Sequence, residues 1–163
     1  MALIHYDLAA ENDKLQGFLM TMMEEETDFI ERAQEQGYRL DDLHSLDSLE
    51  ELERYVREQK VTFTDSSDEA LDQRTNCWFY LGELVRQNFG GFWRFSMNQD
   101  NTMNWGAYVI EGHSPVEGVE LNPLKLLKGF ILRGCRAEAL RKAIMADVKP
   151  TPFNFDNYPT ESE

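Results

Sequence analysis

The chain has 163 residues, which suits one domain of ordinary size, and 42% of them are apolar, enough for a hydrophobic core. Its 30 acidic residues outnumber 16 basic ones, so the formal net charge is −14. Such a surface repels nucleic acid and anionic membranes, because phosphate binding requires Lys and Arg. We therefore expect no nucleic-acid or membrane partner and favour a basic protein, with solubility alone as the alternative explanation of the charge.

The N-terminal sequence MALIHYDLAAENDK lacks the basic and apolar regions of a signal peptide. No apolar stretch approaches the ~20 residues that a membrane-spanning helix needs. These features predict a cytoplasmic protein. Cys77 and Cys135 do not form a CxxC pair, and each is expected to be a lone buried thiol.

The first predicted element is a helix over residues 7–37. Its apolar residues recur at intervals of three and four and form one stripe, while acidic residues occupy the opposite face. The stripe contains Leu15, Phe18, Leu19, Met22, Phe29, Ile30 and Ala33, and the opposite face contains Glu24, Glu25, Asp28, Glu31 and Glu35.

Two further helices are predicted from capping boxes, at residues 48–51 and 66–69. The first of these helices ends near residue 59. The second is apolar over a wide arc and is therefore expected to be central. Gly82 in its middle suggests a close crossing with another element, and Gly90 and Gly91 end it.

The pattern then changes to strands at residues 92–97 and 103–110, which predicts a hairpin, with a short third strand at residues 119–121. Asn122 and Pro123 begin a helix, and one more helix follows. The sequence thus predicts an α+β fold with a helical N-terminal half, a small antiparallel sheet and C-terminal helices. We expect one domain over residues 1–148 and an extended or flexible tail over residues 149–163.

The negative charge is concentrated near the N-terminus. Residues 1–60 have a net charge of −10, whereas residues 123–149 have a net charge of +5. Docking of the basic helices on the acidic ones would cancel only part of this excess. Some acidic surface must therefore stay open, and the residues predicted to contact a partner are Asp41, Asp42, Asp47, Glu50 and Glu51, with Glu24 and Glu25 as second choices.

No catalytic or metal-binding pattern is present. The three histidines are isolated, the acids lack the spacing of a calcium loop, and the two adjacent glycines follow a helix rather than a strand. We therefore expect no cofactor, no metal site and no enzyme. Two alternatives remain open: a Cys–His pair involving His113, and a ligand pocket near the hairpin formed by Trp93, Trp105, Tyr108 and His113.

Two segments resemble a small bacterial family with the patterns SLxxLE and LGExxRxxxGGxW. They are Leu46 to Glu53 and Tyr80 to Trp93; the resemblance covers residues 46–93 best and residues 103–132 loosely. Some members of that family look like immunity proteins of polymorphic toxin systems. The resemblance implies no catalytic residues and leaves the N-terminal helix unaccounted for.

Charge and resemblance together predict an immunity-type protein that neutralises a basic bacterial toxin domain through an acidic surface. The alternatives are a small ligand-binding domain or enzyme with a pocket near the hairpin, and an acidic inhibitor that mimics DNA. The last would need carboxylates in two long rows. The sequence does not fix the oligomeric state.

Overall fold

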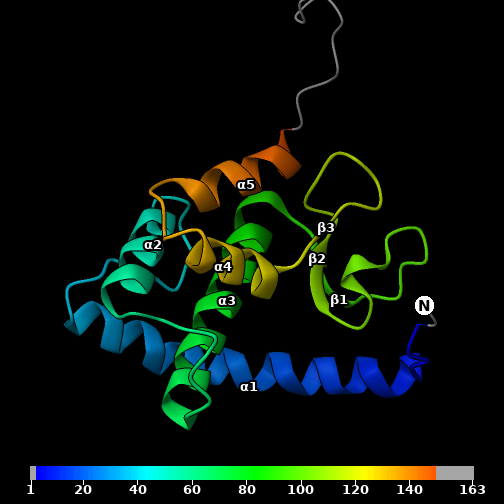
Figure 1. Cartoon of the computed structure of the whole chain (residues 1–163), viewed down its shortest axis with the longest axis horizontal. Coiled ribbons are helices and arrows are strands. Elements are labelled where there is room, and N and C mark those ends of the chain that lie inside the picture. The colour runs from blue at the N-terminus through cyan, green and yellow to red at the C-terminus, as the bar shows by residue number, and fades with distance from the viewer. Residues whose placement is uncertain (1–2, 150–163) are drawn as a thin grey trace, which may run out of the picture.

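The computed structural model describes residues 3–149 and confirms the α+β class (Figure 1). These residues form five α-helices and a three-stranded antiparallel sheet of order β1-β2-β3. The elements are α1 (Leu8–Glu35), α2 (Ser48–Glu58), α3 (Asp68–Phe89), β1 (Phe92–Phe95), a 3₁₀ turn (Thr102–Asn104), β2 (Tyr108–Glu111), β3 (Glu120–Leu121), α4 (Pro123–Leu132) and α5 (Ala139–Val148). The tail predicted for residues 149–163 lies, from residue 150 on, outside the described residues.

Helix α1 runs along one side of the molecule (Figure 1). Asp7 caps it, because its carboxylate accepts the amides of Ala9 and Ala10. The predicted apolar stripe is the buried face, except that Phe18 is half-buried and the unpredicted Glu26 is buried beside it. Among the described residues, no helix is both long and apolar enough to cross a bilayer.

The two predicted capping boxes are wrong in detail. The Ser48 hydroxyl donates to the carbonyl of Ser45 and pairs with the Tyr80 hydroxyl, so it does not cap α2. Helix α3 is capped by Ser67, one residue later than predicted, through the amide of Ala70. At α2 the tertiary contact with Tyr80 takes the hydroxyl that local chemistry would have used as a cap.

Helix α3 is central, as its wide apolar arc predicts. Phe79, Tyr80 and Leu81 are fully buried in a core to which all five helices and the sheet contribute. The close crossing predicted at Gly82 is confirmed, because a Cβ there would lie 2.3 Å from the ring of Trp93 in β1. The glycine lets the helix pack directly on this indole.

The hairpin strands are shorter than predicted. β1 pairs with β2 only over Phe92–Phe95 and Tyr108–Glu111, and the segment between them includes the 3₁₀ turn. Two asparagines explain the difference: the side chains of Asn98 and Asn101 accept the amides of Asp100 and Met103 and bend the chain away from the ladder. The third strand forms as expected and pairs with β2.

Helix α5 lies on the side of the molecule opposite α1, and α4 packs on α3 between them (Figure 1). The predicted Asn122 cap is confirmed by its bond to the amide of Lys125. Helix α5 begins at Ala139, and its first turn is bonded by a side chain of α2, as described below. Cys135 lies in the turn between the two helices and is only half-buried, whereas Cys77 is fully buried as predicted.

Candidate functional site

Three of the five acids predicted first as partner contacts have partners within the chain. Asp41 accepts the amide and the hydroxyl of Ser45. Glu50 receives Arg141 of α5 at 2.6 and 2.9 Å. Glu51 receives Arg54 at 3.0 Å and the amide of Arg39 at 2.9 Å. These carboxylates contribute to the fold, and any partner would have to compete with their present contacts.

The pKa values of two of these groups reflect their pairing. Hydrogen bonding to Arg54 lowers the pKa of Glu51 to about 2, helped by the amide of Arg39 and the positive charge of both arginines. Hydrogen bonding to Arg141 lowers the pKa of Glu50. Both side chains therefore stay ionised well below neutral pH.

The basic helix α5 docks on the acidic helix α2. Besides the Arg141–Glu50 pair, Arg57 of α2 donates to the carbonyl of Cys135 at 3.0 Å. Glu53 of α2 is buried and accepts the amides of Glu138 and Leu140 at the start of α5. This contact involves acids of α2 and none of those of α1, of which Glu11 and Glu26 are paired with Lys14 and His44.

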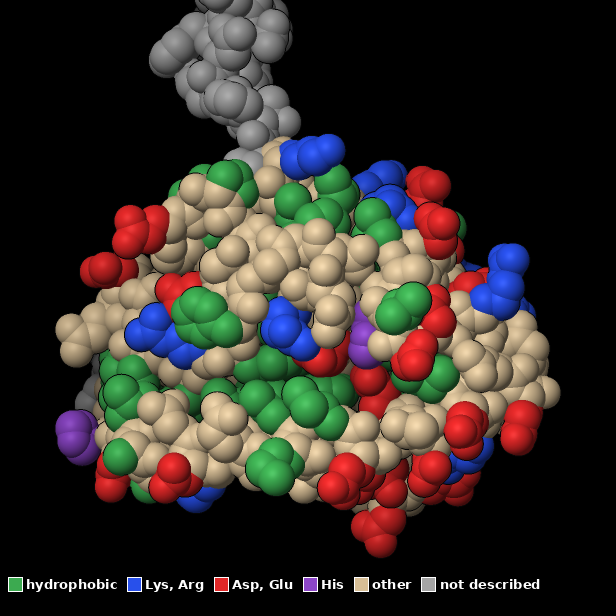
Figure 2. Space-filling model, turned by 180° about the vertical axis from the view of Figure 1, so that it is seen from behind, with side chains coloured by type: hydrophobic (Ala, Val, Ile, Leu, Met, Phe, Trp, Pro, Cys, Tyr) green, Lys and Arg blue, Asp and Glu red, His purple; other side chains and the backbone are tan. Residues whose placement is uncertain are grey.

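The remaining predicted contacts are exposed. Asp42, Asp47, Glu24 and Glu25 form no ion pair with another described residue. Figure 2 shows acidic side chains gathered over the C-terminal half of α1, while apolar side chains gather over its N-terminal half. Whether these residues contact a partner stays a prediction; two of the open acids lie on α1 and two in the connector before α2.

The four residues predicted to form a ligand pocket do not come together. Trp93 is buried against α3 and donates to Glu83 at 3.0 Å. Trp105 donates to the carbonyl of Ile4, and His113 is buried against Asp147 of α5 at 3.2 Å. Sequence reasoning placed them together because their strands are adjacent, but β1 and the loop after β2 direct these side chains to separate neighbours.

A hollow of about 430 Å³ does lie beside the hairpin, and Tyr108 is the predicted residue that lines it. Its other aromatic walls come from three distant segments: Tyr6, Trp78 and Phe95. Tyr108 packs against Phe18 at a centroid distance of 5.2 Å, and Phe18 stacks on Trp78. Glu11 and Lys125 lie at the edge of this set.

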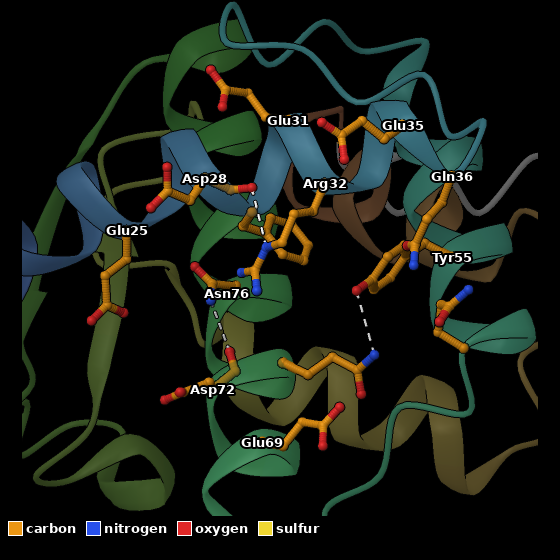
Figure 3. Close-up of a pocket in the computed structure, with 13 residues that line it drawn as sticks. Glu25, Asp28, Glu31, Arg32, Glu35, Gln36, Tyr55, Glu69, Asp72 and Asn76 are labelled. Atoms are coloured by element: carbon orange, nitrogen blue, oxygen red, sulfur yellow. Dashed lines mark hydrogen bonds between the residues drawn. The ribbon is translucent and has the colours of Figure 1, made fainter.

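The open acids of α1 line a larger hollow of about 630 Å³ between α1, α2 and α3, which we call the acidic groove (Figure 3). On α1, the spacing of residues 25, 28, 32 and 35 by three and four places them on one face over ~15 Å. Helix α3 supplies the facing wall. Six acidic residues line the groove: Glu25, Asp28, Glu31, Glu35, Glu69 and Asp72.

None of these six carboxylates forms an ion pair with another described residue, and all six residues are exposed. The single cation of the groove is Arg32, whose Nε donates to the carbonyl of Asp28 at 3.3 Å. Figure 3 shows Arg32 pointing from α1 into the hollow, between the wall of α3 and Tyr55 of α2. The groove therefore has a large excess of negative charge.

The deeper part of the groove offers aromatic carbon and hydrogen-bond acceptors. Phe29 and Tyr55 are buried there, and burial raises the pKa of Tyr55, which keeps its hydroxyl protonated. Gln59 and Gln73 donate their N–H groups to the hydroxyls of Tyr38 and Tyr55, which leaves their amide oxygens unused by the described residues.

Asn76 is the most unusual residue of this wall. It is 3% exposed, and its Nδ2 donates to the carbonyl of Asp72 at 2.9 Å. Its Oδ1 is buried and has no hydrogen-bond partner among the described residues. A buried acceptor without a partner costs roughly 1–3 kcal/mol, so such groups in native proteins call for a physical explanation.

The groove suits cationic side chains rather than one metal ion. No three His, Cys, Asp or Glu side chains of residues 3–149 are close enough to hold a metal, and Figure 3 shows the carboxylates spread over both walls. A nucleophilic Cys–His pair is not favoured either: burial raises the pKa of Cys77, and the Nε2 of His113 pairs with Asp147.

Sequence reasoning found half of this groove. The acidic face of α1 follows from helical spacing, and Glu25 is among the predicted contacts. Glu69, Asp72 and Asn76 were missed, although their spacing of three and four places them on one face of α3. The signal in the sequence was this polar face of α3. The sequence does not show that α3 packs so that this face lies opposite the acidic face of α1.

Comparisons of the chain with protein-family models, with curated proteins and with solved structures found no match.

Proposed function

We propose that the protein is an immunity-type inhibitor that binds a basic toxin domain through the acidic groove. The observation that supports this most is the set of six acidic residues that line one hollow with a single guanidinium and form no ion pair with another described residue. Toxins that act on nucleic acid need cationic surfaces for phosphate. A negative groove would cover such a surface and exclude the substrate.

The net charge of −14 supports the same proposal at longer range. Charge complementarity raises association rates, and the effect falls with ionic strength. Rapid capture suits an inhibitor that protects the cell that makes it. Close mimicry of DNA is less well supported, because ~15 Å of duplex presents about nine phosphates. The groove has six acidic residues.

The test compares two variants with the same change in charge. The groove-neutral variant is Glu25→Gln, Asp28→Asn and Asp72→Asn. The distal-neutral variant is Asp13→Asn, Asp100→Asn and Glu117→Gln, all exposed residues outside the groove. Each protein is produced with the C-terminal domain of a secreted protein encoded beside its gene, and growth is measured.

The wild type and the distal-neutral variant should restore growth, and the groove-neutral variant should fail or require higher expression. Equal protection by both variants would place the interface elsewhere. Absence of protection by the wild type would contradict the immunity role.

The hollow beside the hairpin supports a second candidate function, a small ligand-binding domain. Four aromatic residues line it, from the N-terminal segment, α3, β1 and β2. Aromatic walls with few polar groups are typical of sites for planar apolar ligands. A fragment screen by NMR should then shift Trp78 and Tyr108 together, and Tyr108→Ala should abolish the shifts at Trp78; hits confined to other surfaces would exclude this function.

A further inference from the structure

We propose that the acidic groove receives an arginine side chain from a basic segment of a partner protein, and that Asn76 Oδ1 accepts a hydrogen bond from its guanidinium. This inference rests on the proposed function in naming a basic partner. It adds the identity of the side chain that enters the groove and the residue that recognises it.

The acceptor on the wall of α3 is the first step of the argument. Asn76 lines the groove, and its Oδ1 is buried with no hydrogen-bond partner among residues 3–149, while the amide nitrogen of the same side chain is bonded within α3. The oxygen can only accept, and no described residue donates to it. Carboxylates at Asp72 and Glu69 on the same wall favour a donor that is positively charged.

The aromatic floor favours arginine over lysine. Phe29 and Tyr55 line the groove between the acidic walls. A guanidinium stacks on aromatic rings, presents five N–H donors and binds carboxylates in a bidentate manner, whereas an ammonium group is a compact, strongly hydrated charge. Only the guanidinium can use a ring face, a carboxylate and an amide oxygen at once.

The groove already contains the guanidinium of Arg32, which would compete with an incoming arginine for the same space. Arg32 points into the hollow (Figure 3), yet its one hydrogen bond among the described residues goes to the carbonyl of Asp28. It forms no ion pair with a described carboxylate and no hydrogen bond with Asn76. Removing Arg32 should therefore free the groove for an incoming arginine.

The test uses a labelled hexa-arginine peptide, with hexalysine for comparison, and fluorescence anisotropy at low salt. The wild type should bind one hexa-arginine per chain, and more tightly than hexalysine. Asn76→Leu should weaken hexa-arginine binding roughly ten-fold, since hydrogen bonds to charged groups have about that effect. Arg32→Gln should tighten hexa-arginine binding. The groove-neutral variant should bind hexa-arginine more weakly than the distal-neutral variant, because the two variants have the same net charge and differ only in where the charges were removed.

Urea denaturation of the same variants separates binding from folding. Asn76→Leu should leave the midpoint unchanged or raise it, because the substitution removes a buried acceptor that lacks a partner. Unchanged peptide binding by Asn76→Leu, equal loss by both charge variants, weaker binding by Arg32→Gln, or hexalysine binding with the same dependence on Asn76 would each overturn the inference.

The two proposals fail separately. A wild type that gives no protection but binds hexa-arginine through Asn76 would remove the immunity role and keep the arginine site. Protection that the groove-neutral variant loses, with no effect of Asn76→Leu on peptide binding, would remove the arginine site and keep the immunity role.

Discussion

At the scale of single residues, the carboxylates fall into two groups according to whether a cation of the same chain contacts them. Glu50 and Glu51 are held by arginines, whereas the six acids of the groove form no ion pair within residues 3–149. Neutralising a paired acid removes a stabilising contact, while neutralising an unpaired acid relieves repulsion. If the groove binds a partner as proposed, stability and binding therefore depend on different acidic residues.

Gly82 provides the sharpest single-residue prediction. Gly82→Ala should destabilise the protein by about 1–3 kcal/mol, because the new methyl group would overlap the ring of Trp93 at 2.3 Å. Gly17→Ala is the matched control: the site lies within α1 with no atom within 4 Å of the added Cβ. It should stabilise by about 0.5–1 kcal/mol. Urea denaturation measures both, and a stabilising Gly82→Ala would contradict the crossing.

Glu51 gives a prediction about pH. Its pKa falls from 4.5 to about 2 in the folded protein, so folding favours its ionised form. The stabilisation is therefore complete above pH 4.5 and is lost as the pH falls towards 2. Glu51→Gln should lower the free energy of unfolding at pH 7 by about 1 kcal/mol, allowing for solvent screening. The difference from the wild type should disappear near pH 2, and a difference that persists there would exclude the ion pair as its source.

At the scale of secondary structure, the helices were predictable and their tertiary bonds were not. The stripe of α1, the wide arc of α3 and the Asn122 cap follow from local spacing and chemistry. The predicted partner acids were chosen from the densest acidic stretch, but the Arg141 that neutralises Glu50 lies 91 residues away. Similarly, the contribution of α3 to the groove depends on how α1 packs on α3. Local sequence patterns predict neither the Arg141–Glu50 pair nor this packing.

The start of α5 depends on a side chain from α2. Glu53 accepts the amides of Glu138 and Leu140, which would otherwise be unpaired donors of a helix N-terminus. Glu53→Ala should therefore cost about 1–3 kcal/mol and speed amide hydrogen exchange in α5 more than in α3. Asp47 is the N-cap residue of α2, the helix that contains Glu53, and its side chain forms no capping hydrogen bond. Asp47→Ala should therefore change stability by less than about 0.5 kcal/mol. If Glu53→Ala accelerated exchange equally in α5 and α3, Glu53 would not be the residue that stabilises the start of α5.

At the scale of the whole molecule, a net charge of −14 is distributed unevenly. Between α2 and α5, acidic and basic side chains pair with each other. The acidic residues of the groove, on the C-terminal half of α1 and the start of α3, form no ion pair among the described residues (Figure 2). Unfolding separates these like charges, so the groove opposes folding. A surface that lowers stability while gathering charge in one hollow is expected of a binding site that a cationic partner completes.

This view predicts how stability responds to salt. The groove-neutral variant should be more stable than the wild type by about 1 kcal/mol in 10 mM salt, because it removes three mutually repelling charges. In 1 M NaCl, where the Debye length is about 3 Å rather than about 30 Å, the difference should vanish. The distal-neutral variant should change stability less, since Asp13, Asp100 and Glu117 lie outside the groove. Urea denaturation at both salt concentrations measures this, and a groove-neutral variant less stable than the wild type in 10 mM salt would mean that these carboxylates hold the fold together rather than await a cation.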